Sequence, residues 1–149
     1  MPDPTHYQNI EAERAVLGVI LIARKLPETD LDVFDFTLDT HRTIFRAIRS
    51  LEHPDPILVV QELNRTGSLK KAGGQVLVDS LQVDGFSVAL FAEYVRVLKR
   101  CRAWRLRRSA AHRMLDACER ADEETWLKAE AWIKGEPTNV IDLASRRAS

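Results

Sequence analysis

Residues 87–120 read SVALFAEYVRVLKRCRAWRLRRSAAHRMLDACER and contain neither glycine nor proline. A segment of this kind predicts one helix of about 50 Å, longer than the diameter of a compact domain of this size. We therefore expect the helix to project and to bury an apolar seam against another element or another chain. Residues at alternating steps of four and three form that seam on one helix face. They are Leu90, Tyr94, Val97, Cys101, Trp104, Arg108, Ala111, Leu115 and Cys118.

Charge is distributed unevenly along the chain. The 149 residues have a formal net charge of zero, but residues 96–120 hold nine Arg or Lys side chains and only two acids. Residues 1–95 and 121–134 are both net acidic. Segregated charge of this kind favours pairing within the molecule or directed contacts with partners.

The composition, with 45% hydrophobic and 30% charged residues, is typical of a soluble globular protein. No apolar run approaches the length of a membrane span, and the first residues lack the pattern of a signal peptide. The two cysteines, Cys101 and Cys118, would lie about 25 Å apart on one helix, which is too far for a disulfide. We therefore expect a cytoplasmic protein with reduced thiols and no membrane contact.

Start and stop signals divide the rest of the chain into short helices. Asn9 is a good cap for a largely buried helix that begins at Ile10, and Gly18 within it predicts a close approach to a neighbouring helix. Short turns are expected around residues 31–36. Later signals are Asp39 or Thr40 as a helix start, Asp55-Pro56 as a cap with proline at the first helical position, Gly67 as a stop, Gly73-Gly74 as a break and Ser87 as the cap of the long helix.

A last helix is predicted after Asp122, with Trp126, Ala129 and Ile133 on one face. Its first turn is acidic, whereas the long helix is basic, which favours an antiparallel hairpin. Strand-like alternation is absent, so the chain is expected to be all-α, with a small multi-helix head followed by a projecting helical hairpin. We divide it into a flexible N-terminus (1–8), a helical head (9–86), a hairpin arm (87–134) and a disordered tail (135–149).

The sequence contains no recognisable motif for catalysis, phosphate binding or metal binding. Phosphate-binding glycine motifs are missing, and the four histidines are scattered without the spacing of a metal site. His41, near a helix start, is best explained by a structural role. We expect no catalytic residues, no cofactor and no metal.

Four segments in order resemble the N-terminal domain of DnaB-type replicative DNA helicases. Residues 9–21, NIEAERAVLGVIL, look like the opening helix of that family. The other segments are DFTLDTHRTIFRAIRSL at 35–51, PILVVQELNRTGSLKKAGG at 56–74 and FAEYVRVLKRCRAWRLRR at 91–108. Their matching residues are Phe36, His41, Arg42, Ile44, Phe45, Ala47, Ile48, Val60, Leu63, Gly67, Leu69, Gly73, Gly74, Tyr94, Val97 and Arg105.

The resemblance implies a helical head and a hairpin that pairs with another subunit. In the family, the N-terminal domains of several subunits form one tier of a ring in which subunits are paired, and their hairpins contact primase. The chain departs from the family in three places. Leu90 stands where a polar residue is common, and the loop before Ser87 lacks the usual proline. The segment at 24–36 is also shorter than usual. No Walker motif or arginine finger can be carried over, although a full-length parent would be an ATP-dependent helicase.

The main hypothesis is a replication-associated interaction module without an ATPase domain. It would form a dimer or higher oligomer and contact a replicative helicase, a primase or both, with DNA contact indirect or weak. The tail does not resemble the linker of a full helicase, which favours a small independent protein. The interface candidates are Tyr94, Val97, Cys101, Arg102, Trp104, Arg105, Arg108, Leu115, Trp126 and Trp132.

Two alternatives remain open. Clustered arginine at 96–120 is the pattern that a nucleic-acid-binding helix requires. The zero net charge and neutralisation by the acids at 122–130 count against this hypothesis. The other alternative is the helicase-binding domain of a primase, but the segments EAERAVLG and HRTIF favour the helicase side.

Overall fold

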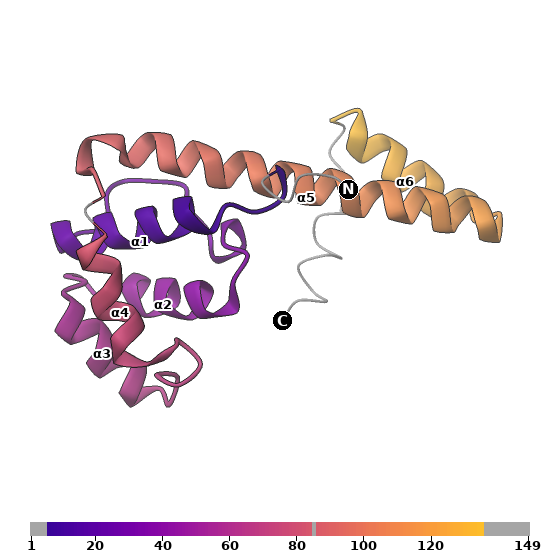
Figure 1. Ribbon diagram of the computed structural model, residues 1–149. Coiled ribbons are helices and arrows are strands. Elements are labelled where there is room, and N and C mark those ends of the chain that lie inside the picture. The colour runs from indigo at the N-terminus through magenta and orange to yellow at the C-terminus, as the bar shows by residue number, and fades with distance from the viewer. Residues whose placement is uncertain (1–5, 85, 136–149) are drawn as a thin grey trace. The chain divides into compact units, whose positions relative to one another are not determined.

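The computed structural model describes residues 6–84 and 86–135, and every regular element in these ranges is a helix (Figure 1). The all-α prediction is confirmed. The predicted flexible N-terminus and tail fall largely on residues 1–5 and 136–149, which lie outside the described residues. The elements are α1 (Ile10–Ala23), the 3-10 helix η2 (Val33–Asp35), α2 (Asp39–Arg49), α3 (Pro56–Arg65), α4 (Gly74–Val83), the 3-10 helix η3 (Val88–Leu90), α5 (Phe91–Arg120) and α6 (Glu123–Ile133).

The chain divides into two compact units, and the division falls inside α5, between Arg102 and Ala103. From here on, the head means the described residues up to Arg102, and the hairpin means those from Ala103 to Gly135. The head therefore includes the first turns of α5, because Leu98 is only 1% exposed within the head core. The sequence placed the boundary earlier, at residue 87.

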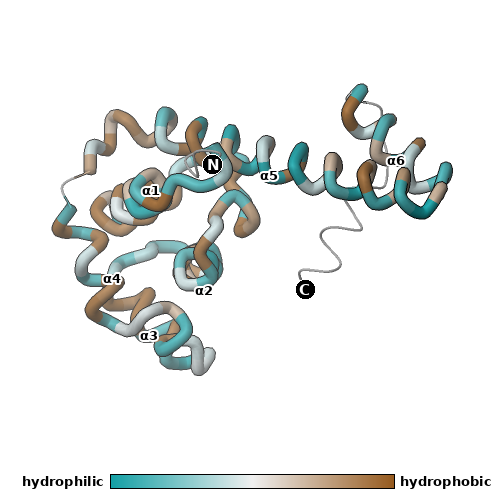
Figure 2. The backbone as a smooth tube through the Cα atoms, turned by 45° about the vertical axis from the view of Figure 1, so that its right-hand side comes forward, coloured by the Kyte–Doolittle hydropathy of each residue, from teal (hydrophilic) through white to brown (hydrophobic). Residues whose placement is uncertain are grey.

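The central element of the head is α1, whose residues are mostly hydrophobic (Figure 2). It packs against α2 and α4. A Cβ atom at Gly18 would lie only 2.5 Å from the carbonyl oxygen of Leu81 and 2.6 Å from Cδ2 of Phe86. The predicted close approach is therefore confirmed. The largest fully buried apolar side chains around α1 are Phe36, Phe45, Ile44, Ile48, Leu63, Leu81 and Leu98.

Local capping explains where several helices begin. The Asn9 side chain accepts a hydrogen bond from the Ala12 N–H at 2.9 Å, and Asp55 accepts one from Ile57 at 2.8 Å, with Pro56 in the first turn. Both caps were predicted. Such caps contribute about 1 kcal/mol each to stability.

The predicted start of the long helix at Ser87 is wrong. Its side chain makes no capping hydrogen bond, and η3 separates it from α5, which begins at Phe91. The N–H of Leu90 bonds to the carbonyl of Ser87 at 3.1 Å, so the first turn is wound more tightly than an α-helix.

The start of α2 is capped by a side chain from another helix. Leu38, at its N-cap position, provides no side-chain cap. Instead, the Glu13 carboxylate accepts hydrogen bonds from the backbone N–H of Thr37 at 2.6 Å and of Leu38 at 3.5 Å, and from the Thr37 hydroxyl. Nδ1 of His41 lies 2.7 Å from the same carboxylate. Glu13 and His41 are both buried, so His41 has the structural role that the sequence suggested.

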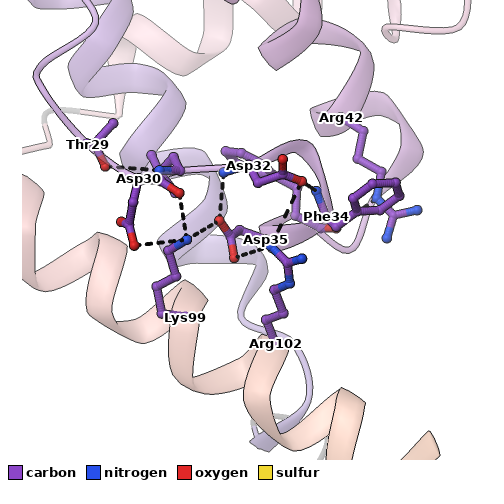
Figure 3. A network of polar contacts seen from close by, with 10 residues as sticks. Thr29, Asp30, Asp32, Phe34, Asp35, Arg42, Lys99 and Arg102 are labelled. Atoms are coloured by element: carbon purple, nitrogen blue, oxygen red, sulfur yellow. Dashed lines mark hydrogen bonds and ion pairs between the residues drawn. The ribbon is translucent and has the colours of Figure 1, made fainter. Parts of the chain in front are cut away.

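A second buried carboxylate joins η2 to α5 (Figure 3). The Asp35 side chain is fully buried and lies 2.8 Å from Lys99 Nζ and 3.3 Å from Arg102 Nη1. It also accepts a hydrogen bond from the Asp32 N–H at 2.8 Å. Lys99 in turn donates to the carbonyl of Asp30 at 2.8 Å. Part of the segregated charge is thus paired within the molecule, and it fastens the first turns of α5 to the rest of the head.

The predicted seam is only partly correct in the head. The face of α5 that enters the core consists of Phe91, Val95, Leu98 and Cys101, whereas Leu90 is 47% exposed. The buried row starts one residue later than the predicted one, but both rows include Cys101, and Tyr94 and Val97 of the predicted seam are half-buried against the core. Contact with the head core and with η2, whose residues lie far away in the sequence, selects this row.

Candidate partner-binding surface

The hairpin consists of the remaining turns of α5 and of α6, which runs back beside them (Figure 1). The chain reverses at Ala121, which has a φ of 53°. Asp122 then caps α6, as predicted, through a hydrogen bond from the Thr125 N–H at 3.1 Å. Hydrogen bonds from the hydroxyl and the backbone of Thr125 lower the pKa of Asp122.

Small side chains form the buried contact of the hairpin. Ala110 and Ala117 of α5 and Ala129 of α6 are 4%, 3% and 2% exposed. No larger hydrophobic side chain of residues 103–135 is fully buried. The two helices therefore cover an alanine row, leave Leu106 and Met114 beside it half-buried, and leave Trp104 and Leu115 exposed.

The hairpin exposes large apolar side chains. Trp104 is 43% and Leu115 is 60% exposed on α5, and Leu127 and Ile133 are 53% and 55% exposed on α6. Ala111 and Cys118, also exposed, continue the row of Trp104 and Leu115 at helical spacing. The second half of the predicted seam therefore faces outward. We call these four residues of α5, from Trp104 to Cys118, the apolar row.

The structure separates the predicted interface residues into two groups. Four lie in the head: Cys101 is buried, Tyr94 and Val97 are half-buried, and Arg102 pairs with Asp35. The Tyr94 ring also stands edge-on to Phe86, with ring centroids 6.4 Å apart. The others lie in the hairpin, namely Trp104, Arg105, Arg108 and Leu115 on α5, and the half-buried Trp126 and Trp132 on α6.

Three surface residues of the hairpin were not among the predicted candidates. The guanidinium of Arg107 lies 4.7 Å from the centroid of the Trp104 ring, in a cation–π contact. Leu127 lies outside the apolar pattern read for α6. Ile133 was expected to face inward but is exposed. The spacing of four between Ala129 and Ile133 suggested a shared inward face, but only Ala129 of these two residues is buried.

Ion pairs in the hairpin are local. Arg120 pairs with Asp116 at 2.8 Å, and Lys134 pairs with Glu130 at 3.2 Å, each within one helix. Lys128 and Glu124 form a further pair within α6. Among the residues of the hairpin that the structure describes, no ion pair joins α5 to α6. The charge of Arg120 on α5 nevertheless helps to lower the pKa of Asp122, after the hydrogen bonds from Thr125, so the acids that follow α5 do offset part of its basic charge.

In the described part of the chain, no group of His, Cys, Asp and Glu side chains is arranged to hold a metal ion. None of its helices has the length and apolar character needed to cross a bilayer. The fold and this surface define an all-helical domain whose second compact unit is a helical hairpin.

Comparisons with known proteins identify the family. Residues 5–100 match the family model described as the DnaB-like helicase N terminal domain. The chain therefore belongs to this family, and the resemblance seen in the sequence is confirmed. The match covers the head, and the hairpin lies beyond it.

A solved structure extends the match. The N-terminal domain of DnaB helicase from Mycobacterium tuberculosis is 27% identical in sequence and superposes with a TM-score of 0.75. The alignment covers 87% of this chain and 99% of that one. The likeness therefore includes a large part of the hairpin as well as the head.

Two curated relatives are replicative DNA helicases DnaB. The protein from Treponema pallidum (strain Nichols) is 32% identical over 66% of this chain, and that from Rhodothermus marinus is 33% identical over 61%. The chain spans 26% and 10% of their respective lengths. The family model and the solved structure are both of the N-terminal domain, and these 149 residues do not include the ATPase domain.

Proposed function

We propose that this protein is a replication-associated interaction module. It self-associates through its hairpin and docks onto the N-terminal tier of a replicative helicase, onto primase, or onto both, in the cytoplasm. The apolar row on α5 carries this proposal. The family relationship, to proteins named as replicative DNA helicases, supplies the class of partner.

The apolar row supports a helical partner. Trp104, Ala111, Leu115 and Cys118 follow steps of seven, four and three, which is the spacing that packs against a second helix. Within the described residues α6 covers a different row, and Leu115 keeps 60% of its surface exposed. A second copy of the hairpin or a related helicase hairpin offers the complementary surface.

Arginine and tryptophan flank this row. Arg105 and Arg108 stand beside it on α5, and Trp126 and Trp132 lie half-buried on α6. Tryptophan and arginine are the residue types that most often dominate the energetics of protein interfaces. Family membership favours the helicase side over the alternative of a primase-derived helicase-binding domain.

Self-association is tested with a charge placed in the row. Leu115→Arg should convert an oligomer into a monomer in size-exclusion chromatography with light scattering, because a buried charge opposes apolar contact. Val76→Arg is the matched control, since Val76 is 82% exposed on α4 of the head. It should leave the oligomer intact. A wild-type monomer at high micromolar concentration, unchanged by Leu115→Arg, would contradict the proposal.

The partner is tested by capture. Immobilised wild-type protein should retain purified helicase N-terminal domain or primase, and the Arg105→Ala/Arg108→Ala variant should retain much less. Circular dichroism of the variant checks that the helices persist. Equal retention by both proteins would show that these arginines are not part of the docking surface.

A further inference from the structure

Within the hairpin, α6 covers the alanine row of α5 but leaves the apolar row open. Ala110 and Ala117 are 4% and 3% exposed, whereas Trp104 and Leu115 keep 43% and 60% of their surfaces exposed. These two exposed side chains are about three turns apart, so they lie on one side of the helix. Exposed apolar side chains gathered on one side favour the docking of a further apolar segment.

A basic side chain borders the apolar row. The guanidinium of Arg107 lies 4.7 Å from the centroid of the Trp104 ring, and it forms no ion pair with any described residue. An acidic group that arrives beside the row can therefore pair with Arg107 without displacing another acid, and such charge-assisted contacts are stronger than neutral ones. The row thus favours an occupant that is apolar and that carries acids.

One segment of this chain has the matching composition. Residues 136–143 read EPTNVIDL and lie outside the described residues. The segment contains the apolar residues Val140, Ile141 and Leu143, the acids Glu136 and Asp142, and no base. It therefore complements the row both in apolar character and in charge.

The segment also starts close enough to reach the row. From the reversal at Ala121, α6 runs back beside α5 to Ile133, which places its last turn level with about residue 109 of α5 (Figure 1). The five residues from Gly135 to Val140 span at most about 17 Å when extended. A helix with its side chains is only about 10–12 Å wide. The chain can therefore pass from α6 around α5 to the apolar row.

We propose that residues 140–143 dock onto the apolar row of their own hairpin between Trp104 and Leu115, with Asp142 close to Arg107. One consequence rests on the proposed function: if copies associate through the same row, the segment competes with a second copy. A short linker gives an effective concentration of about 1 mM, and a docking Kd of about 100 µM then leaves about ten closed chains for each open one.

Docking is tested in the dilute full-length chain through the accessibility of one thiol. Ala111→Cys/Cys118→Ser places that thiol in the middle of the row, while the native Cys101 is buried in the head. Alkylation by iodoacetamide at about 1 µM protein should become about tenfold faster when Ile141→Ser/Leu143→Ser is added, because the row is then open all the time. Circular dichroism checks that each variant remains helical.

Competition is tested by sedimentation of the full-length chain without the added thiol. Ile141→Ser/Leu143→Ser should tighten self-association about a hundredfold, because each of two copies no longer has to open against a tenfold preference for the closed form. The matched control is Ala144→Ser/Ala148→Ser, which adds the same two hydroxyl groups after the segment and keeps the net charge. The control should stay within about twofold of the wild type in both measurements.

The two measurements separate this proposal from the proposed function. An alkylation rate that Ile141→Ser/Leu143→Ser leaves unchanged would overturn docking, even if the protein self-associates. Faster alkylation with an unchanged dissociation constant would overturn the competition with a second copy. If all variants stay monomeric while alkylation still accelerates, docking of the segment is supported and only self-association is contradicted.

Discussion

Glu13 shows how one side chain can hold two helices of the head together. It belongs to α1, yet it accepts the backbone N–H groups at the start of α2 and contacts His41 one turn further on. Burial alone would raise the pKa of this carboxyl group, but hydrogen bonds from His41 and Thr37 outweigh burial and lower the pKa below its usual value. The folded state therefore favours the ionised carboxylate.

Replacing this carboxylate should destabilise the head. Glu13→Gln should lower the free energy of unfolding by about 2–3 kcal/mol at neutral pH, because the hydrogen bonds lose their charged acceptor. Urea denaturation measures this difference. Glu11→Gln, at an exposed position on the same helix turn, is the matched control and should have an effect of less than about 0.5 kcal/mol.

The lowered pKa of Glu13 also predicts a pH dependence. A carboxyl group with a lower pKa in the folded state stabilises the protein above the unfolded-state pKa, and this stabilisation is lost as the pH falls through the folded-state pKa. The wild type should therefore lose stability below about pH 4. Glu13→Gln should lose less over the same range, and an identical acid-induced loss in both proteins would show that Glu13 does not contribute.

At the scale of elements, the start of α5 depends on contacts far apart in the sequence. Asp35 in η2 and the pair Lys99 and Arg102 in α5 are more than 60 residues apart, and they meet around one buried carboxylate (Figure 3). A buried charge flanked by two cations is tolerated, but removal of the carboxylate leaves the cations without their shared partner. These two ion pairs and the buried side chains Phe91, Val95 and Leu98 together fix the rotation of α5 about its axis.

Asp35→Asn should loosen the first turns of α5. We expect unfolding free energy to fall by about 2 kcal/mol, because charge-assisted hydrogen bonds are lost from a buried site. Amide hydrogen exchange of residues 91–102 should accelerate more than that of α3. The control is Asp30→Asn, whose side chain is 84% exposed and only 3.5 Å from Lys99. Comparable effects of both substitutions would argue against a special role for Asp35.

The sequence predicted those features that depend on neighbouring residues. The caps Asn9, Asp55 and Asp122 act within three residues, so their sequence signal is local. The rotation of α5 was not predictable in this way, since two adjacent rows of the helix are both apolar enough to be buried. The candidate surface shows the same division. Trp104 and Leu115 follow from heptad spacing, whereas Ile133 required knowledge of which α6 face meets α5.

At the scale of the whole molecule, the chain belongs to the DnaB-like helicase N-terminal domain family, and its 149 residues include no ATPase domain. Purified protein should show no ATP hydrolysis and no strand separation, because these 149 residues contain no set of side chains that holds a triphosphate and magnesium. A coupled ATPase assay and a fluorescent unwinding assay measure the two activities. Activity that copurifies with the protein and disappears after a single substitution in this chain would refute this expectation.

The alanine contact of the hairpin has a consequence for the timing of assembly. No hairpin side chain larger than alanine is fully buried, so closing α6 onto α5 through Ala110, Ala117 and Ala129, with Trp126 and Trp132 only half-buried, releases less free energy than packing of the leucine and phenylalanine core of the head. Parts of a protein with few buried apolar contacts open locally far more often than the core does. An isolated hairpin should therefore open and close repeatedly while the head stays folded. A partner that covers Trp104 and Leu115 would suppress this opening, so that capture of the partner and completion of the fold become one event.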